Sequence, residues 1–428
     1  MHVDSGHKGG DDLNHGKKGC GASSKKLVGQ TMPLAVDLFA GAGGLSLGAE
    51  MAGVEPVYAN DLFAEAAETY RMNHPATYFD ERPIEDVSAE AILQRVGLVP
   101  GDLDILLGGP PCQGFSINAP ARQMDDHRNS LILEYLRLVG GLRPKYILIE
   151  NVPGLLSLDR GYALRVVYER LRDLGYEVNH RVLLASNYGV PQERWRLIIL
   201  GHRDDVVAPV FPAPTHAATA RANFTGGARW SVPEEALRHL PPAVTVAEAI
   251  GDLPSLANGG GSSPVPMPPG VRLTAFQRWA RSGAKELYNH QAPKLSPVNL
   301  QRLRHIQPGG NWTDIPFDLL PTGMKRARRS DHTKRYGRMD PNGQSCTILT
   351  KCDPHWGSFF HYGQDRAITP REAARLQTFP DGYVFTGPPS LQYEQVGNAV
   401  PPLLAEAVVG AIVSAWSATV RGLAEVVR

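Results

Sequence analysis

Short apolar runs alternate with stretches of helical spacing between residues 34 and 203. The apolar runs predict buried strands, and apolar positions three and four apart in the stretches between them predict helices. The expected strands are LAVDLFA (34–40), VEPVYAN (54–60), LDILLGG (103–109), KYILIEN (145–151), YEVNHRVLLA (176–185) and RWRLIILGH (194–202). Helices are expected after residue 48 and at 62–72, 129–142 and 165–175. Strands that alternate with helices are typical of a doubly wound α/β sheet.

The alternation ends near residue 203, where Pro, Gly and Ala become frequent, and few long helices are expected before about residue 363. From Ala399 the run LLAEAVVGAIVSAW has helical character and is expected to pack back onto the first sheet. The expected division is a flexible tail at 1–30, an α/β domain at 31–203, an inserted irregular domain at 204–390 and a returning segment at 391–428. A length of 428 residues agrees with more than one domain.

The charges of the chain balance overall but not locally. Lys and Arg number 44 and Asp and Glu number 43, so a polyanionic partner must meet a local basic patch. Residues 323–338 (GMKRARRSDHTKRYGR) supply such a patch, with seven Lys or Arg side chains and a single acid, Asp331. A run of this kind either binds phosphates or is a solvated face.

Membrane, disulfide and metal classes are not indicated. No run approaches the roughly 18 apolar residues of a membrane-spanning helix, and the polar N-terminus has no apolar signal segment. The four cysteines, Cys20, Cys112, Cys346 and Cys352, contain no C-x-x-C pair, so neither a disulfide scaffold nor a zinc site is suggested. We expect a cytoplasmic protein with no metal and no membrane partner.

A glycine-rich loop, DLFAGAGG, follows the first predicted strand and opens a predicted helix. Such loops let a ligand approach the backbone closely. Gly41 and Gly43 fit the dinucleotide pattern, but Ser46 stands at the third glycine, and Asp61, twenty positions after Gly41, suits ribose hydroxyls. Asp37 would repel a pyrophosphate and suits the positive sulfonium and ammonium of S-adenosylmethionine. A glycine-rich turn without a ligand and an NAD-type oxidoreductase are the alternatives.

A second polar loop, GGPPCQGFS, follows the strand predicted at 103–109. Its prolines stiffen the backbone before Cys112, and open α/β sheets bind ligands at the carboxyl ends of their strands. A thiolate at this position can act as a nucleophile. A lone cysteine is more often a small buried apolar residue, but this loop is too polar for a core position.

Six sequence blocks together resemble the DNA (cytosine-5) methyltransferase family. They are DLFAGAGG, PPCQGFS, ENV (150–152), PQERWR (191–196), TPREAARLQTFP (369–380) and QVGNAVPP (395–402), in the family's order. The resemblance implies a Rossmann-like methyltransferase sheet that binds S-adenosylmethionine, formed by 31–203 with 391–428. It also implies that 204–390 is an inserted target-recognition domain.

The resemblance implies a reaction at carbon 5 of cytosine through a covalent intermediate. The Cys112 thiolate adds to carbon 6, and Glu150 contacts nitrogen 3 and the exocyclic amine. Arg196 contacts the base oxygen and Arg194 supports it; without the family context, these three charges would be read as solvated surface groups. The target must flip out of the duplex to reach the thiol. The loop 113–128 is expected to close over DNA, or is an ordinary surface loop.

The same resemblance assigns the cofactor contacts. The expected roles are adenine stacking for Phe39, ribose binding for Asp61, the adenine amine for Asp86 and the methionine moiety for Asn398. Leu62 stands where the family often has an aromatic residue, so Phe63 is a candidate to cover that side of the adenine. The expected cofactor-binding set is Asp37, Phe39, Gly41, Gly43, Gly44, Leu45, Asp61, Leu62, Asp86, Val87, Pro110 and Asn398.

Basic and polar side chains are expected at the DNA, mostly from the basic run and the recognition region. The expected set is Ser116, Arg128, Lys325, Arg326, Arg328, Arg329, Lys334, Arg335, Arg338 and Lys351. Lys351 belongs to TILTK (347–351), which resembles the end of the family's recognition domain, whereas Cys346 and Cys352 are expected to be structural.

The expected function is methylation of carbon 5 of a specific cytosine in double-stranded DNA, by a monomer with one site per chain. The compact architecture suits a bacterial restriction–modification enzyme whose partner is a restriction endonuclease for the same site. A tRNA cytosine-5 methyltransferase is the nearest alternative, and the long recognition region favours DNA. A catalytically dead DNA-binding relative is disfavoured because Cys112, Glu150 and Arg196 are all present.

Overall fold

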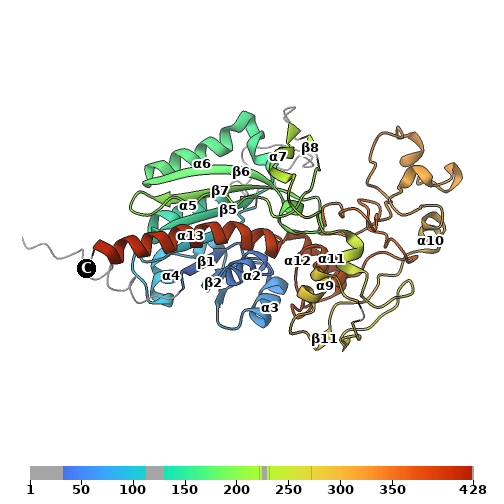
Figure 1. Cartoon of the computed structure of the whole chain (residues 1–428), viewed down its shortest axis with the longest axis horizontal. Coiled ribbons are helices and arrows are strands. Elements are labelled where there is room, and N and C mark those ends of the chain that lie inside the picture. The colour runs from blue at the N-terminus through green and yellow to red at the C-terminus, as the bar shows by residue number, and fades with distance from the viewer. Residues whose placement is uncertain are drawn as a thin grey trace, which may run out of the picture.

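A mixed seven-stranded sheet forms the core of the first half of the chain (Figure 1). The computed structural model describes residues 32–111, 130–220, 222–223, 229–230, 232–270 and 272–426. The strands are β1 (Leu34–Leu38), β2 (Glu55–Asn60), β3 (Tyr78–Asp80), β4 (Ile105–Gly108), β5 (Tyr146–Asn151), β6 (Tyr176–Leu184) and β7 (Trp195–Arg203), in the order β3-β2-β1-β4-β5-β7-β6. Within this sheet β7 runs antiparallel to its neighbours, because the short link after β6 returns the chain directly alongside it.

Helices cover both faces of the sheet. On one face, α4 (Ala89–Val96), α5 (Ser130–Leu142) and α6 (Tyr162–Asp173) enclose a large apolar core. On the other face, α2 (Gly44–Met51) and α13 (Pro402–Val426) enclose a second core, and α13 crosses the front of the molecule in Figure 1. A further helix, α3 (Ala64–Asn73), packs against the edge formed by β2 and β3. This arrangement confirms the predicted doubly wound fold class.

The sequence pattern missed two elements, β3 and α4. β3 has three residues at the edge of the sheet, and α4 has eight, so neither is long enough for a clear periodicity. Capping signals for α4 were nevertheless present: the Ser88 side chain accepts a hydrogen bond from the Ala91 backbone, and Gly97 ends the helix in the left-handed conformation.

The second half of the chain consists mainly of loops with short elements. These are β8 (Ala222–Asn223), β9 (Arg229–Trp230), α7 (Glu234–Leu237), α8 (Val246–Ile250), β10 (Val265–Pro266), α9 (Ala275–Ala280), β11 (Glu286–Leu287), α10 (Pro297–Leu303), α11 (Pro370–Leu376) and α12 (Pro389–Asn398). Two small apolar cores stabilise this region. One of them includes Ala42 of the glycine-rich loop, so the irregular region packs directly against the α/β domain.

The TPREAARLQTFP block forms α11, which is buried along its whole length. Two of its charged side chains pair with residues that flank the block. Glu372 accepts two hydrogen bonds from Arg366 at 2.6 and 2.7 Å, and Arg375 donates two hydrogen bonds to Asp381 at 2.6 and 2.8 Å. Arg371 donates mainly to backbone carbonyls, and burial lowers its pKa to about 10. The block is therefore a buried polar framework beneath the irregular region.

The C-terminal helix corrects one sequence expectation. The stretch Pro389–Gly422 contains a helical run long and apolar enough to cross a membrane by length and composition alone, although no such run was expected. Leu404, Val408, Val409 and Ile412 of α13 are buried against α2 and the sheet. The apolar composition of this helix thus has an explanation in the packing of the α/β core.

Candidate active site

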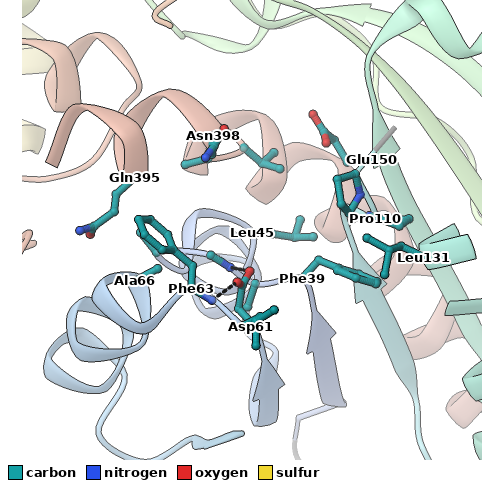
Figure 2. Close-up of a pocket in the computed structure, with 18 of the residues that line it drawn as sticks. Phe39, Leu45, Asp61, Phe63, Ala66, Pro110, Leu131, Glu150, Gln395 and Asn398 are labelled. Atoms are coloured by element: carbon teal, nitrogen blue, oxygen red, sulfur yellow. Dashed lines mark hydrogen bonds between the residues drawn. The ribbon is translucent and has the colours of Figure 1, made fainter. Parts of the chain in front are cut away.

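A cavity of about 1010 Å³ opens at the carboxyl ends of β1, β2, β4 and β5 (Figure 2). Its walls come from the residues that follow these strands and from the end of α12. This is the edge at which open α/β sheets bind ligands. The cavity brings together expected site residues that are far apart in the sequence, namely Phe39, Gly41, Leu45, Asp61, Leu62, Pro110, Glu150, Arg194, Arg196 and Asn398.

The glycine-rich loop and the end of β2 are joined by Asp61. One oxygen of its carboxylate accepts a hydrogen bond from the Gly41 backbone at 2.8 Å, and the other accepts one from the Phe63 backbone at 2.9 Å. Burial raises the pKa of Asp61. Each carboxylate oxygen can accept a further bond, so the group can still receive ribose-like hydroxyls from the cavity.

Two phenylalanines line the cavity, at well-separated positions along its wall (Figure 2). Phe39 has a positive φ of 58°, which is strained for a bulky residue and is typical of functional positions. Phe63 follows Leu62, whose side chain is 65% exposed. The sequence therefore provides an aromatic side chain in the cavity one residue later than the family pattern suggests.

Asp37 does not line the cavity. Its side chain is fully buried beneath the loop and accepts a hydrogen bond from the Ser46 hydroxyl at 2.6 Å. Its second oxygen has no partner among the residues that the structure describes. Burial raises the pKa of Asp37 to about 7. The carboxyl group thus lies behind the loop, where it cannot touch a ligand in the cavity directly.

Gly43 and Gly44 also lie outside the cavity wall, and packing explains why they are glycines. A Cβ on Gly43 would lie 2.6 Å from both His74 Nε2 and the Tyr383 hydroxyl, and a Cβ on Gly44 would lie 2.4 Å from the Val400 carbonyl. The two glycines therefore allow the loop to approach α3 and the chain before α13.

Asp86 and Val87 are likewise absent from the cavity wall. Asp86 is exposed, and Val87 is buried in the apolar core. The wall contains Ile84 and Glu85 instead, which the sequence reasoning did not single out. The 3₁₀ turn at Ile84–Asp86 points neighbouring residues in different directions, and this turn had no signal in the sequence pattern.

Glu150, which lies across the cavity from Asp61 in Figure 2, forms an ion pair with Arg196. The Arg196 Nε lies 2.6 Å from a Glu150 oxygen, and both side chains are largely buried. Burial lowers the pKa of Arg196, although the nearby Glu150 opposes this shift. The next residue, Asn151, donates a hydrogen bond to the Pro110 carbonyl at 3.0 Å, which ties the ENV block to the PPC loop.

Cys112 lies outside the described residues, as do Cys20, Ser116, Arg128 and the loop 113–128. The residue before Cys112, Pro111, lines the same cavity as Glu150. The described part of this loop therefore ends, at Pro111, in the wall of the cavity.

Arg194 connects three parts of the chain. Its guanidinium donates to the carbonyls of Ile348 at 3.1 Å, Gly397 at 2.9 Å and Ala399 at 3.1 Å. Burial and the neighbouring Arg196 hold the pKa of Arg194 well below its usual value. Its Nε has no partner among the residues that the structure describes. Arg194 thus joins the start of β7 to the end of the recognition region and to α12.

Asn398 is the last residue of α12 and is exposed at the cavity. Gln395 of the same helix and Asn60 at the end of β2 also line the cavity, and the sequence reasoning missed both. Asn60 ends a strand that the sequence predicted, which was the available signal for it, whereas no helix was predicted at the position of Gln395.

The expected DNA-binding side chains behave in two ways. Lys325, Arg326, Arg328, Arg329, Lys334 and Lys351 are exposed. Arg335 is half-buried, with its guanidinium 4.8 Å above the ring of Trp356. Arg338 instead donates to the carbonyls of His361 and Tyr362 and pairs with Asp365 at 3.2 Å. Its guanidinium is thus engaged within the protein, which makes it a structural residue in this structure.

Comparison with known families decides the identity of the site. A family model for C-5 cytosine-specific DNA methylases matches residues 34–414. The chain belongs to this family. It is therefore a DNA (cytosine-5)-methyltransferase, which transfers a methyl group to carbon 5 of cytosine in DNA, and the family predicted from the six sequence blocks is confirmed.

Individual relatives of this methyltransferase agree with the family assignment. The Type II methyltransferase M.AgeI of Thalassovita gelatinovora is 34% identical over 421 residues, which cover 87% of this chain and 97% of the relative. DNA (cytosine-5)-methyltransferase 1A of Oryza sativa subsp. japonica is 32% identical over 92% of this chain, but only 29% of that longer protein is covered.

Solved structures show the same fold. The crystal structure of a protein described as a DNA modification methyltransferase encoded within an E. coli prophage aligns with a TM-score of 0.66 and 26% identity, covering 90% of this chain and 99% of that one. A DNMT2 mutant of Spodoptera frugiperda aligns with a TM-score of 0.52 and 16% identity, over 89% and 99% of the two chains. This second likeness concerns the fold alone.

Proposed function

We propose that the methyl donor is S-adenosylmethionine and that it binds between the glycine-rich loop and α12. The cavity suits this molecule in three respects: an acid, Asp61, can receive ribose hydroxyls; Phe39 and Phe63 offer aromatic surfaces for an adenine; and the wall near Gly41 lets a ligand approach the backbone. Asn398 lies at the part of the wall formed by α12. When bound, this cofactor supplies the electrophilic methyl group.

Asp37 has an indirect role in this proposal. Because it lies behind the loop, it affects a cationic ligand only through its field and through the Ser46 hydroxyl. Val87, Gly43 and Gly44 are proposed to shape the site by packing, since none of them lines the cavity, whereas Asp86 is exposed next to the cavity residue Glu85.

The cytosine is proposed to enter the cavity beside Glu150, after flipping out of the duplex. Cys112 Sγ forms a bond to carbon 6, and Glu150 holds a proton at nitrogen 3 so that negative charge does not build up on the ring. When the proton on carbon 5 is later removed, the electron pair re-forms the ring double bond and the Sγ–carbon 6 bond breaks. Arg196 orients Glu150 through their ion pair and can donate to the base oxygen.

Residues 204–390 are proposed to recognise the DNA, with phosphate contacts from the exposed members of the basic run. Arg194 would then transmit the position of this region to the active site, because it binds both Ile348 and the end of α12. We further propose that the enzyme acts as a monomer in the cytoplasm. A restriction endonuclease of the same specificity is its proposed partner, as the Type II name of M.AgeI suggests.

The ion pair of Glu150 with Arg196, in the same cavity as Asp61, is the single observation that carries this proposal. The test is incubation of the protein with S-adenosylmethionine labelled in its methyl group and, separately, with duplex DNA or tRNA. We expect label in the DNA, and bisulfite sequencing should locate it at one cytosine of a defined site. Label confined to tRNA would overturn the proposal.

An Asp61→Asn variant should bind the cofactor about tenfold or more weakly in calorimetry, since it loses a charged acceptor.

A further inference from the structure

Trp356 is an exposed aromatic residue that is held rigidly. Its side chain is 55% exposed. It ends a turn in which the Asp353 carbonyl accepts from the Trp356 backbone at 2.9 Å and the Asp353 carboxylate accepts from the His355 backbone at 2.8 Å. The His355 ring packs edge-on against the indole with centroids 4.9 Å apart. An exposed ring fixed in this way loses little conformational entropy when it binds a partner.

Two further contacts hold the surroundings of the indole. The Arg335 guanidinium lies 4.8 Å above the Trp356 ring. The hydroxyl of Tyr336 is 3.0 Å from His355 Nδ1, and the Tyr336 backbone donates to the Pro354 carbonyl at 2.6 Å. Because the guanidinium covers only one side and more than half of the residue is exposed, ring surface remains for an external partner.

The turn lies beside the segment that leads into the active site. The Ser358 hydroxyl donates to the Lys334 carbonyl at 3.2 Å, and Lys334 Nζ is 3.7 Å from a Glu193 oxygen. The Thr347 hydroxyl donates to the Glu193 carbonyl at 2.8 Å. Glu193 directly precedes Arg194, which lines the cavity. These contacts connect the turn that carries Trp356 to the segment that enters the cavity.

The surface around the turn suits nucleic acid. Arg335, which belongs to the basic run 323–338 and packs on the indole, also contacts the Met324 sulfur at 3.8 Å and so connects the two parts of this run. Arg326, Arg328 and Arg329 are exposed and have no acidic partner in the ranges that the structure describes. An indole among unpaired arginines is typical of surfaces on which bases stack between phosphate contacts.

We propose that Trp356 contacts a nucleobase of the target site through its ring and so helps to select the site, while the arginines hold the phosphates. The proposal rests on DNA recognition by residues 204–390. Such a contact acts by stacking or by packing on a thymine methyl group, not by charge. Its loss should therefore weaken binding without changing the number of phosphate contacts.

The test compares Trp356→Leu with Trp356→Phe on a duplex that carries the site found by bisulfite sequencing of DNA methylated by the wild type. For Trp356→Leu we expect about tenfold weaker DNA binding, a raised KM for DNA and relaxed site selection. Trp356→Phe, which keeps an aromatic ring, should retain most of the affinity. Binding of S-adenosylmethionine should be unchanged in both variants, which also shows that they fold.

The salt dependence separates stacking from charge. The slope of the logarithm of the DNA association constant against the logarithm of the salt concentration should stay unchanged for Trp356→Leu. In an Arg328→Ala/Arg329→Ala double variant, the magnitude of this slope should decrease by about 1.8, because two phosphate contacts are lost. Tyr78→Ala is the matched control, because Tyr78 is exposed with Arg95 stacked 3.7 Å above it, on an edge strand away from the recognition region.

Two results would overturn the inference: wild-type affinity and site selection in Trp356→Leu, or a slope change equal to that of the arginine variant. If the wild-type protein itself methylated no duplex DNA, the proposed function would fail first, and this would be seen before any variant was compared.

Discussion

Glu150 illustrates how single side chains in this enzyme are prepared for chemistry. Its carboxylate is largely buried and is oriented by Arg196 at 2.6 Å, while the adjacent Asn151 fixes the PPC loop. The ion pair therefore holds this carboxylate in one place in the cavity wall.

Replacement of Glu150 by Gln should lower kcat by about 10²–10⁴-fold, because an amide cannot deliver a proton to nitrogen 3. Affinity for S-adenosylmethionine should stay within about twofold, since the proposed cofactor contacts are centred on Asp61 and Phe39. Single-turnover methylation assays with calorimetry of the cofactor check both statements. A variant with wild-type turnover would remove Glu150 from the reaction.

Asp37 should make the stability of the protein depend on pH. Its pKa is about 7 in the folded protein and 3.8 when unperturbed, so ionisation opposes folding. Its contribution is fully favourable below about pH 4 and is lost as the pH rises to about 7. An Asp37→Asn variant should therefore gain on the order of 2–4 kcal/mol over the wild type at pH 8, and less at pH 5. Thermal melts at the two pH values measure this difference, and a gap that did not widen with pH would contradict it.

Close contact between helices determines how the C-terminal helix joins the α/β domain. A Cβ on Gly48 of α2 would lie 2.3 Å from the Ala405 side chain and 2.6 Å from the Pro402 carbonyl of α13. Glycine is thus required where the two helices cross. The pairing also places the end of α12, with Asn398, at the cavity.

Two glycine-to-alanine changes test this crossing. Gly48→Ala should destabilise the protein by about 1–3 kcal/mol, because the added methyl group forces α2 away from α13. Gly410→Ala, on α13, meets no atom within 4 Å and should be neutral or stabilising by up to about 1 kcal/mol through helix propensity. Unfolding curves in denaturant give both values; equal effects at the two positions would show that the crossing is not tightly packed.

The buried charges around α11 predict sensitivity to acid. Arg366 lowers the pKa of Glu372 to about 2, and burial lowers the pKa of His361 to about 4. Both groups favour the folded state at neutral pH. The contribution of His361 to the free energy of unfolding is lost as the pH drops from about 6.5 to 4. The contribution of Glu372, roughly 3 kcal/mol, is lost as the pH drops from about 4.5 to 2.

A Glu372→Gln variant should lose about 3–5 kcal/mol at pH 7, because Arg366 is left buried without its partner. Its stability should then fall less steeply than that of the wild type between pH 4.5 and 3. Denaturant midpoints measured across this range check the slopes, and parallel curves would show that Glu372 does not titrate in the assumed direction.

Across the whole molecule, the α/β half was predictable from the sequence and the irregular half was not. Strands such as β1 and β5 appear in the sequence as mainly apolar runs, and such runs predict buried strands. Asp61 directly follows β2 and Glu150 lies near the end of β5, which is why both were found. The second half folds through buried polar contacts such as Arg338 with the His361 carbonyl. Those contacts depend on loop geometry that no periodicity records, so the internal bonds of Arg338 could not be predicted.

The two halves of the molecule act as one site in this account. The charges of the chain nearly cancel overall, yet seven Lys or Arg side chains lie in residues 323–338 of the irregular half, while acids such as Asp61 and Glu150 line the cavity of the other half. Arg194 connects the halves through carbonyls on both sides. DNA held by one half can thus present a single flipped base to the other.

The most direct test of the central claim is intact-mass spectrometry of the enzyme after reaction with S-adenosylmethionine and a duplex that carries 5-fluorocytosine at the target position. Fluorine on carbon 5 blocks removal of a proton there, so the account predicts a stable covalent complex attached at Cys112, and none with a Cys112→Ala variant. An enzyme that methylates ordinary duplex DNA but forms no such complex would contradict it.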